Sequence, residues 1–146
     1  MGVFLIVVRR TLLKNQLINM IILKIPQVCI NHNTCRRIPH NMSNQRMHWA
    51  KKNRWNSEWK DAVGWEVNLQ RKQFGKLPLL FAKIQVVIHA VRLMDYDGAY
   101  NAVKPLIDGL KGSVIVDDSP AHIDLKVVQK HVASYAQESV EIHISG

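Results

Sequence analysis

An amphipathic stretch with carboxylates at both ends, 95–120 (DYDGAYNAVKPLIDGLKGSVIVDDSP), sets strong limits on how this chain can fold. At about 100° per residue, one side of a helix here would be polar, with Asp97, Asn101, Lys104 and Asp108. The other side would be apolar, with Ala99, Val103, Leu106 and Leu110. Because such an apolar side packs on a sheet, we expect a helix over 95–110 with its polar side outward. Pro105 lies inside it, so either the helix kinks there or a new helix begins at Pro105.

Two pairs of carboxylates flank this helix. Asp95 and Asp97 begin it, and Asp117 and Asp118 follow a short apolar run, 113–116, that we expect to be a buried strand. We expect the pairs to converge, and a cation must then lie among them, because close carboxylates repel one another. Hard oxygen ligands without His or Cys favour Mg²⁺ or Mn²⁺ over zinc. Asp is also typical of helix N-caps and turns, and the spacing alone leaves both interpretations open.

Charge is distributed unevenly along the 146 residues, whose net charge is +9. Residues 36–76 carry ten basic and three acidic side chains, whereas residues 77–146 carry six basic and eight acidic ones. A basic part that holds phosphates and an acidic part that holds metal are typical of a nuclease. A basic chain that is merely soluble could have the same net charge, so charge alone does not decide between a nuclease and such a chain.

The segment 27–51 is rich in Asn, His and Arg and lacks aliphatic periodicity, so we expect a loop that contacts phosphates. The predicted DNA contacts lie at its end and just beyond it: Arg46, His48, Trp49, Lys51, Lys52 and Arg54. Among these residues, Trp49 is the best candidate for stacking on bases.

The two cysteines of the chain lie in the same segment. Cys29 and Cys35, with His32 and His40, could form a zinc site. However, five residues separate the two cysteines, whereas zinc sites usually begin with two cysteines that are separated by two to four residues. Nothing marks the chain as secreted, which argues against a structural disulfide. We therefore expect two reduced cysteines.

The remaining periodicity predicts a single α+β domain with a mixed sheet of four or five strands and two main helices. Strands are expected over 20–26, 77–91, 123–127 and 140–144. A second helix is expected over 53–74, with Asn56 or Ser57 as its N-cap. Its predicted apolar set is Trp55, Trp59, Ala62, Val63, Trp65 and Val67.

The N-terminal residues 1–19 have no clear pattern beyond a short apolar run. They are too short and interrupted to span a membrane, and no signal-peptide cleavage site follows them. Because the strand pattern begins at Met20, we expect residues 1–19 to be an extension without a catalytic role, Met20 to be a natural start, and 20–146 to be the functional domain.

The order of several motifs points to one family. A D-x-D run precedes a helix that contains KPLIDGL, a short strand follows and ends in DDSP, and upstream lies Asn44-x-Arg46-x-His48-Trp49-Ala50-Lys51. Over about residues 20–146, this order resembles the RusA family of Holliday junction resolvases, particularly its phage and prophage members. One departure is Gly98, because many members have Asn directly after the second Asp and the lysine one turn later.

The resemblance implies a Mg²⁺-dependent endodeoxyribonuclease, RusA-like in fold, that resolves four-way DNA junctions by paired nicks as a homodimer in the cytoplasm. It implies that Asp95, Asp97 and Asp118 bind the metal, with Asp117 in support, and that Lys104 is the catalytic lysine. A bulky apolar residue beside the first Asp, Met94 or Leu93, would help to open the junction. Two alternatives remain: a non-catalytic, prophage-derived DNA-binding module, and a nuclease for branched or flap DNA.

Overall fold

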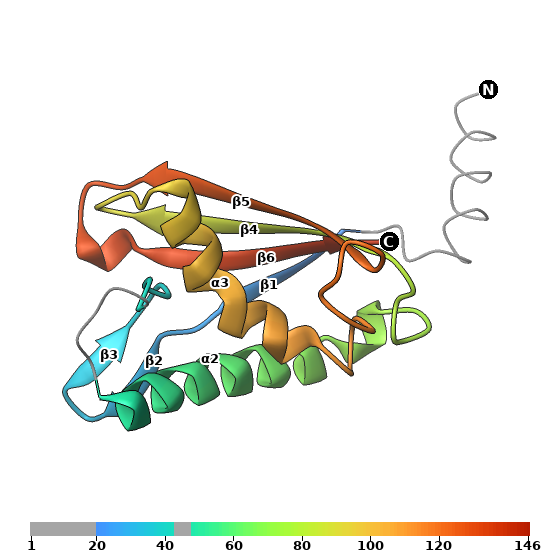
Figure 1. Cartoon of the computed structure of the whole chain (residues 1–146), viewed down its shortest axis with the longest axis horizontal. Helices are drawn as coiled ribbons and strands as arrows, with labels where there is room; N and C mark the ends of the chain where they lie inside the picture. The colour runs from blue at the N-terminus through green and yellow to red at the C-terminus, as the bar shows by residue number, and fades with distance from the viewer. Residues whose placement is uncertain (1–19, 43–47) are drawn as a thin grey trace.

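A four-stranded mixed sheet forms one layer of the molecule, and two helices cover one of its faces (Figure 1). The computed structural model describes residues 20–42 and 48–146, so the predicted extension 1–19 lies outside it. The strands lie in the order β1 (Ile21–Ile25), β6 (Ser139–Ser145), β4 (Ala82–Ala90) and β5 (Ile123–His131). β4 and β5 pair in parallel, and the other two pairings are antiparallel. The prediction of an α+β domain with a mixed sheet and two main helices is therefore confirmed.

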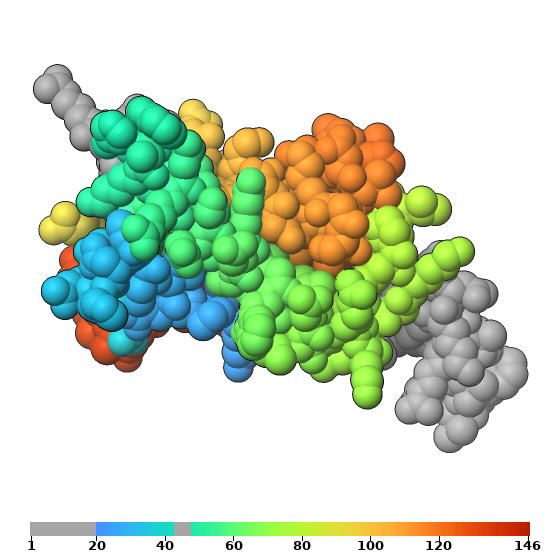
Figure 2. Space-filling view, turned by 90° about the horizontal axis from the view of Figure 1, so that it is seen from below, coloured from blue at the N-terminus to red at the C-terminus, as the bar shows by residue number. Residues whose placement is uncertain are grey.

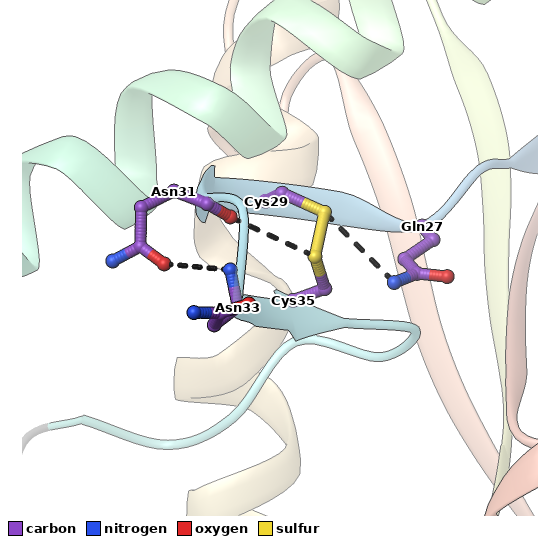
Figure 3. Close-up of a disulfide and its surroundings, with 5 residues drawn as sticks. All are labelled: Gln27, Cys29, Asn31, Asn33 and Cys35. Carbon is purple, nitrogen blue, oxygen red and sulfur yellow. Dashed lines mark hydrogen bonds between the residues drawn. A yellow bond between two sulfur atoms is a disulfide. The ribbon is translucent and has the colours of Figure 1, made fainter.

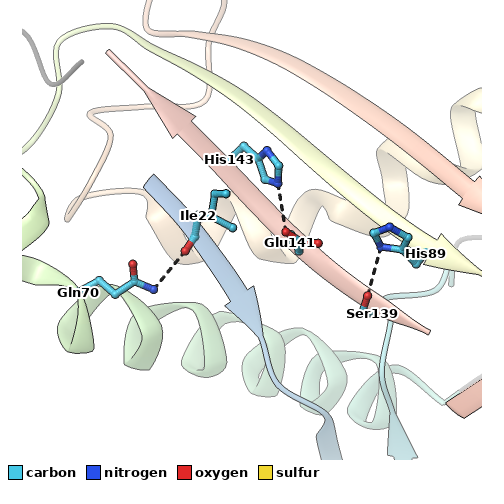
Figure 4. Close-up of polar contacts among 6 residues, drawn as sticks. All are labelled: Ile22, Gln70, His89, Ser139, Glu141 and His143. Atoms are coloured by element: carbon cyan, nitrogen blue, oxygen red, sulfur yellow. Dashed lines mark hydrogen bonds and ion pairs between the residues drawn. The ribbon is translucent and has the colours of Figure 1, made fainter. Parts of the chain in front are cut away.

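Strand β4 shows how alternation in the sequence builds the core. Its residues at even positions, Ala82 to Ala90, are at most 1% exposed and face the helices. No helix of the described residues covers the opposite face, which is mostly polar. Polar pairs lie along it, with His89 Nδ1 3.2 Å from Ser139 Oγ and His143 Nε2 3.3 Å from Glu141 Oε2 (Figure 4). The sheet therefore buries one face against the helices and leaves the other polar.

Helix α2 (Trp49–Leu69) begins earlier and ends earlier than predicted. Its N-cap is His48, whose Nδ1 accepts a hydrogen bond from the Ala50 N–H at 3.2 Å, and a 3-10 turn, η1 (Arg71–Gln73), follows it. Predicting Asn56 or Ser57 as the cap was wrong, because the imidazole of His48 supplies the acceptor more than two turns upstream. At the other end, Gln70 Nε2 donates to the Ile22 carbonyl at 3.2 Å and joins this helix end to β1 (Figure 4).

Two of the tryptophans anchor α2 in the core. Trp55 and Trp59 are at most 1% exposed, as their helical spacing with Val63 and Val67 predicts. Trp65 is 65% exposed, so its assignment to the apolar set was wrong. The buried positions follow one another in steps of four residues, and Trp65 lies two residues from the last two of them, which places it on a different face of the helix.

The segment 27–51 is not a loop throughout, and that prediction was wrong. It forms a hairpin of β2 (Val28–Asn31) and β3 (Thr34–Arg36), with Val28 and Ile30 buried. The Arg36 guanidinium lies 4.2 Å from the centre of the Trp55 ring, so a cation–π contact joins the hairpin to α2. Figure 2 shows the hairpin in blue on one side of α2, with α3 and the segment after it in orange on the other.

A disulfide joins Cys29 and Cys35 across this hairpin (Figure 3). The two residues are direct partners in the strand register, with their Cα atoms 4.0 Å apart. The expectation of reduced cysteines is therefore contradicted by the structure. That expectation rested on the absence of any mark of secretion, whereas the hairpin places Cys29 and Cys35 opposite each other.

The second helix, α3 (Tyr96–Leu110), runs without a break through Pro105, so no new helix begins at that proline. Its apolar side is buried as predicted, and Val103, Leu106 and Leu110 have no exposed surface. The predicted strand over 113–116 is absent, and only single bridges join Ile115 to Leu79 and Lys111. Within 20–42 and 48–146, no helix is long and apolar enough to cross a membrane.

Candidate functional site

Asp95 and Asp97 lie at the N-terminal end of α3, directly after the turn that leaves β4. Asp95 is the N-cap, and its Oδ1 accepts a hydrogen bond from the Gly98 N–H at 2.7 Å. A Cβ at position 98 would lie 2.5 Å from that same oxygen, so a side chain there would displace the capping carboxylate. Gly98 is the departure from the family pattern, and its lack of a side chain leaves room for Asp95 Oδ1 to cap the helix. Both carboxylates are exposed to solvent, with Asp97 in the first turn.

Hydrogen bonds from the sheet hold the turn that carries these carboxylates. The Gln129 side chain accepts from the Met94 N–H at 2.7 Å and donates to the Met94 carbonyl at 2.8 Å. The Val91 N–H donates to Glu138 at 3.0 Å. Sequence reasoning missed Gln129, because a glutamine on a strand carries no signal of what it contacts. Of the two apolar residues beside Asp95, Met94 packs against the core and Leu93 is 55% exposed.

Asp117 and Asp118 lie beside two lysines of the α3 segment. Lys104 Nζ is 3.7 Å from Asp118 Oδ2, and Lys111 Nζ is 3.5 Å from Asp118 Oδ1 and 3.6 Å from Asp117 Oδ1. Two of the predicted catalytic residues, Lys104 and Asp118, are thus brought together. Lys111, the C-cap of α3, was missed as a partner of these carboxylates.

This ion-pair network shifts the protonation of its members. The pKa of Asp118 lies below its ordinary value of 3.8, mainly because of a side-chain hydrogen bond with Asp117, and the charges of Lys111 and Lys104 act in the same direction against desolvation. The negative charge of Asp118 is, in turn, the main cause that raises the pKa of Lys111. Asp118 is therefore ionised over the whole neutral range.

The structure does not bring the two carboxylate pairs together. Within the described ranges, no group of three or more His, Cys, Asp or Glu side chains is placed to hold a metal ion. The reason is the length of the unbroken helix: Asp97 and Lys104 are two turns apart, about 10 Å along the axis, and Asp118 lies beside Lys104. The predicted convergence is therefore not found.

The donor chemistry of each pair still suits Mg²⁺. Carboxylate oxygens are hard ligands, and Mg²⁺ is commonly held by one or two carboxylates together with waters and substrate phosphates rather than by a cage of protein side chains. Asp95 and Asp97 are exposed and form such a pair, as do Asp117 and Asp118 after the helix. The four residues fit the metal by type, as two separate pairs.

Most of the predicted DNA contacts lie on the first turns of α2. Trp49 is 69% exposed, and the His48 ring lies 5.6 Å from it, tilted by 31°. Lys51 and Arg54 are exposed, whereas Lys52 is half-buried and faces α3. Arg46 lies outside the described residues. The cationic start of α2 thus lies next to the helix that carries Lys104.

A groove of about 290 Å³ separates the two helices at this point. Its lining comes from α2, from α3 and from the segment after the hairpin: Lys52, Asn56, Asn101, Lys104, Pro105, Asp108, His40, Asn41 and Met42. Three of the residues on the predicted polar side of α3, Asn101, Lys104 and Asp108, therefore face this groove. We refer to it below as the α2–α3 groove.

Comparisons with protein-family profiles, with curated proteins and with solved structures find no match for this chain. The resemblance to RusA resolvases therefore rests only on the motifs in 44–51 and 95–120. The geometry around α3 is the independent basis on which a function can be proposed.

Proposed function

We propose that this protein is a Mg²⁺-dependent endodeoxyribonuclease that resolves four-way DNA junctions by paired symmetric nicks. One observation carries the proposal: the Lys104 amino group lies 3.7 Å from the carboxylate of Asp118, a residue from a different segment of the chain. The resemblance marks both residues for catalysis, and nothing in helical periodicity requires them to meet. Two symmetric cuts need two sites, so the proposed enzyme acts as a two-fold homodimer, in the cytoplasm.

The residues of the chain have separable roles in this proposal. Lys104 is 65% exposed and can neutralise the charge that develops on a phosphate during hydrolysis. Asp95, Asp97, Asp117 and Asp118 would hold Mg²⁺, which when bound polarises a phosphate and activates water. The basic start of α2 would hold the DNA backbone. Leu93, exposed beside Asp95, is available for insertion between bases at the junction.

The test compares cleavage of a labelled four-way junction by the wild-type protein and by Asp97→Asn. We expect nicking that needs Mg²⁺ and stops in EDTA. Asp97→Asn should bind the junction as well as the wild type and lose cleavage by roughly a hundredfold or more, the size typical of removing one charge-handling group at a reaction centre. Asp124→Asn, the same substitution at an exposed position of β5, is the matched control and should cleave normally.

A non-catalytic DNA-binding module is the second candidate, and a specific observation favours it. Asp95 caps α3, and Asp117 and Asp118 pair with lysines, so three of the four carboxylates have structural partners. Tight junction binding without any cut in Mg²⁺ or Mn²⁺ would support this module and contradict the nuclease. Cleavage of flaps in preference to four-way junctions would instead favour a nuclease for branched or flap DNA.

A further inference from the structure

Three polar side chains of the α2–α3 groove have no hydrogen-bond partner among the residues that the structure describes. Lys52 and Asn56 lie one turn apart on α2, and Asn101 faces them from α3. Within 20–42 and 48–146, no hydrogen bond or ion pair engages these three side chains. Lys52 and Asn56 are also half-buried, and both line the groove. Half-buried donors without protein partners are suited to a ligand that accepts hydrogen bonds.

The charge of the groove favours an anion. Lys52 and Lys104 contribute two positive charges, and Asp108 is the one carboxylate among the lining residues. Desolvation and the charge of Arg36 lower the pKa of His40, so this residue adds hydrogen-bonding nitrogen atoms rather than charge at neutral pH. One carboxylate among two amines is a poor set of ligands for a metal ion.

The size and the walls of the groove narrow the choice of anion. About 290 Å³ lies at the lower limit of small-ligand pockets, enough for a group of nucleotide size. Met42 and Pro105 add apolar surface beside the amines and amides, which suits a sugar next to a charged group. Lys104 both lines the groove and contacts Asp118, so a group bound there would lie beside the predicted catalytic residues.

We propose that the α2–α3 groove binds a backbone phosphodiester of the DNA substrate, with Lys52, Asn56 and Asn101 as donors. This inference rests on the proposed function, because it names the part of the substrate that this surface would hold. Phosphate contacts fix the register of a protein on DNA without reading its sequence. The groove would therefore position the strand along α3 relative to the carboxylates at the two ends of that helix.

The first test measures junction binding in EDTA over a range of salt concentrations. If Lys52 neutralises one phosphate, Lys52→Gln should weaken binding for all sequences alike, and the slope of log K against log salt should fall by about one. Lys60→Gln removes the same charge from an exposed position of α2 that does not line the groove. This control should keep a steeper slope and a higher affinity than Lys52→Gln. Equal behaviour of the two variants would overturn the proposal.

The second test follows the side-chain amide signals of Asn56 and Asn101 by NMR. A short single-stranded oligonucleotide should shift both signals, whereas the signal of Asn68, exposed near the far end of α2, should stay in place. A deoxynucleoside monophosphate is the comparison ligand. If the monophosphate shifts the signals and the oligonucleotide does not, the groove binds free nucleotides and its assignment to DNA is wrong.

Together the two tests separate this inference from the proposed function. If the protein cleaves junctions with metal but the Asn56 and Asn101 signals do not shift, the nuclease proposal is supported and the proposed phosphate site in the groove is contradicted. If the signals shift and Lys52→Gln weakens binding, but no cleavage occurs in Mg²⁺ or Mn²⁺, the phosphate site in the groove is supported and the nuclease proposal is contradicted. A wild-type protein that binds neither junction nor oligonucleotide would contradict both.

Discussion

At the scale of single residues, the site is organised by lysines that neutralise carboxylates. Lys111 touches both Asp117 and Asp118, and Lys104 touches Asp118 from the other side. All four side chains remain partly exposed, so each ion pair is screened by solvent and adds little to stability on its own. For the proposed function, what matters is that Lys104 lies at the carboxylate of Asp118 while 65% of its side-chain surface stays exposed.

The lowered pKa of Asp118 predicts a specific pH dependence. A carboxyl whose pKa is lower in the folded state stabilises the fold above its unfolded pKa, near 3.8, and this contribution is lost as pH falls through the folded value. Lys111→Gln removes one of the charges responsible, so the melting temperature should fall slightly at neutral pH, and its difference from wild type should shrink towards pH 2. Thermal melts from pH 2 to 7 measure this.

Lys130→Gln, at an exposed position of β5, is the control for the general loss of a positive charge. Its difference from wild type should not follow the titration of Asp118. A Lys111→Gln difference that stays constant down to pH 2 would show that this ion pair does not couple to the protonation of Asp118.

At the scale of elements, helices and strands with a long regular pattern could be predicted, whereas short segments without such a pattern could not. The alternation in β4 and the apolar side of α3 are long patterns, and the structure confirms both. The hairpin was missed because β2 and β3 are short and rich in Asn, Cys and Arg, and only Val28 and Ile30 signal burial. The start of α2 was missed because His48 is an unusual N-cap.

The close packing of α2 on α3 predicts opposite effects for two glycines. A Cβ at Gly109 would lie 3.0 Å from the Lys60 carbonyl oxygen and 3.0 Å from Val63 Cβ, whereas a Cβ at Gly64 would meet nothing within 4 Å. Alanine in a helix interior gains about 1 kcal/mol over glycine. Overpacking against backbone costs about 1–3 kcal/mol.

We therefore expect Gly109→Ala to lower the free energy of unfolding and Gly64→Ala to raise it by about 0.5–1 kcal/mol. Urea unfolding curves of both variants give these values, and the paired design cancels the common gain in helix propensity. A Gly109→Ala variant as stable as Gly64→Ala would mean that the two helices are not in close contact at this point.

At the scale of the whole molecule, the candidate site depends on how separate segments lie relative to one another. The sequence indicated which residue types would matter, and the structure places Lys104 beside Asp118. It could not indicate that Asp118 would lie beside Lys104, two turns of α3 from Asp97, because periodicity describes one helix and not the path of the chain after it. The α2–α3 groove was missed for the same reason, since its lining comes from three segments.

The proposed homodimer belongs to this scale as well, because one chain would offer one set of the proposed catalytic residues and resolution needs two coordinated cuts. A supercoiled plasmid that extrudes a cruciform tests this requirement directly. Two cuts across one junction convert the plasmid to a linear molecule, whereas a single cut releases the supercoiling, reabsorbs the cruciform and leaves a nicked circle.

The decisive measurement is the product of this plasmid after incubation with the purified protein and Mg²⁺. We predict linear DNA with nicks at symmetric positions, no product in EDTA, and no product with Asp97→Asn. Nicked circles alone, or an uncut plasmid that is nevertheless bound tightly, would contradict the proposal that this protein is a junction resolvase.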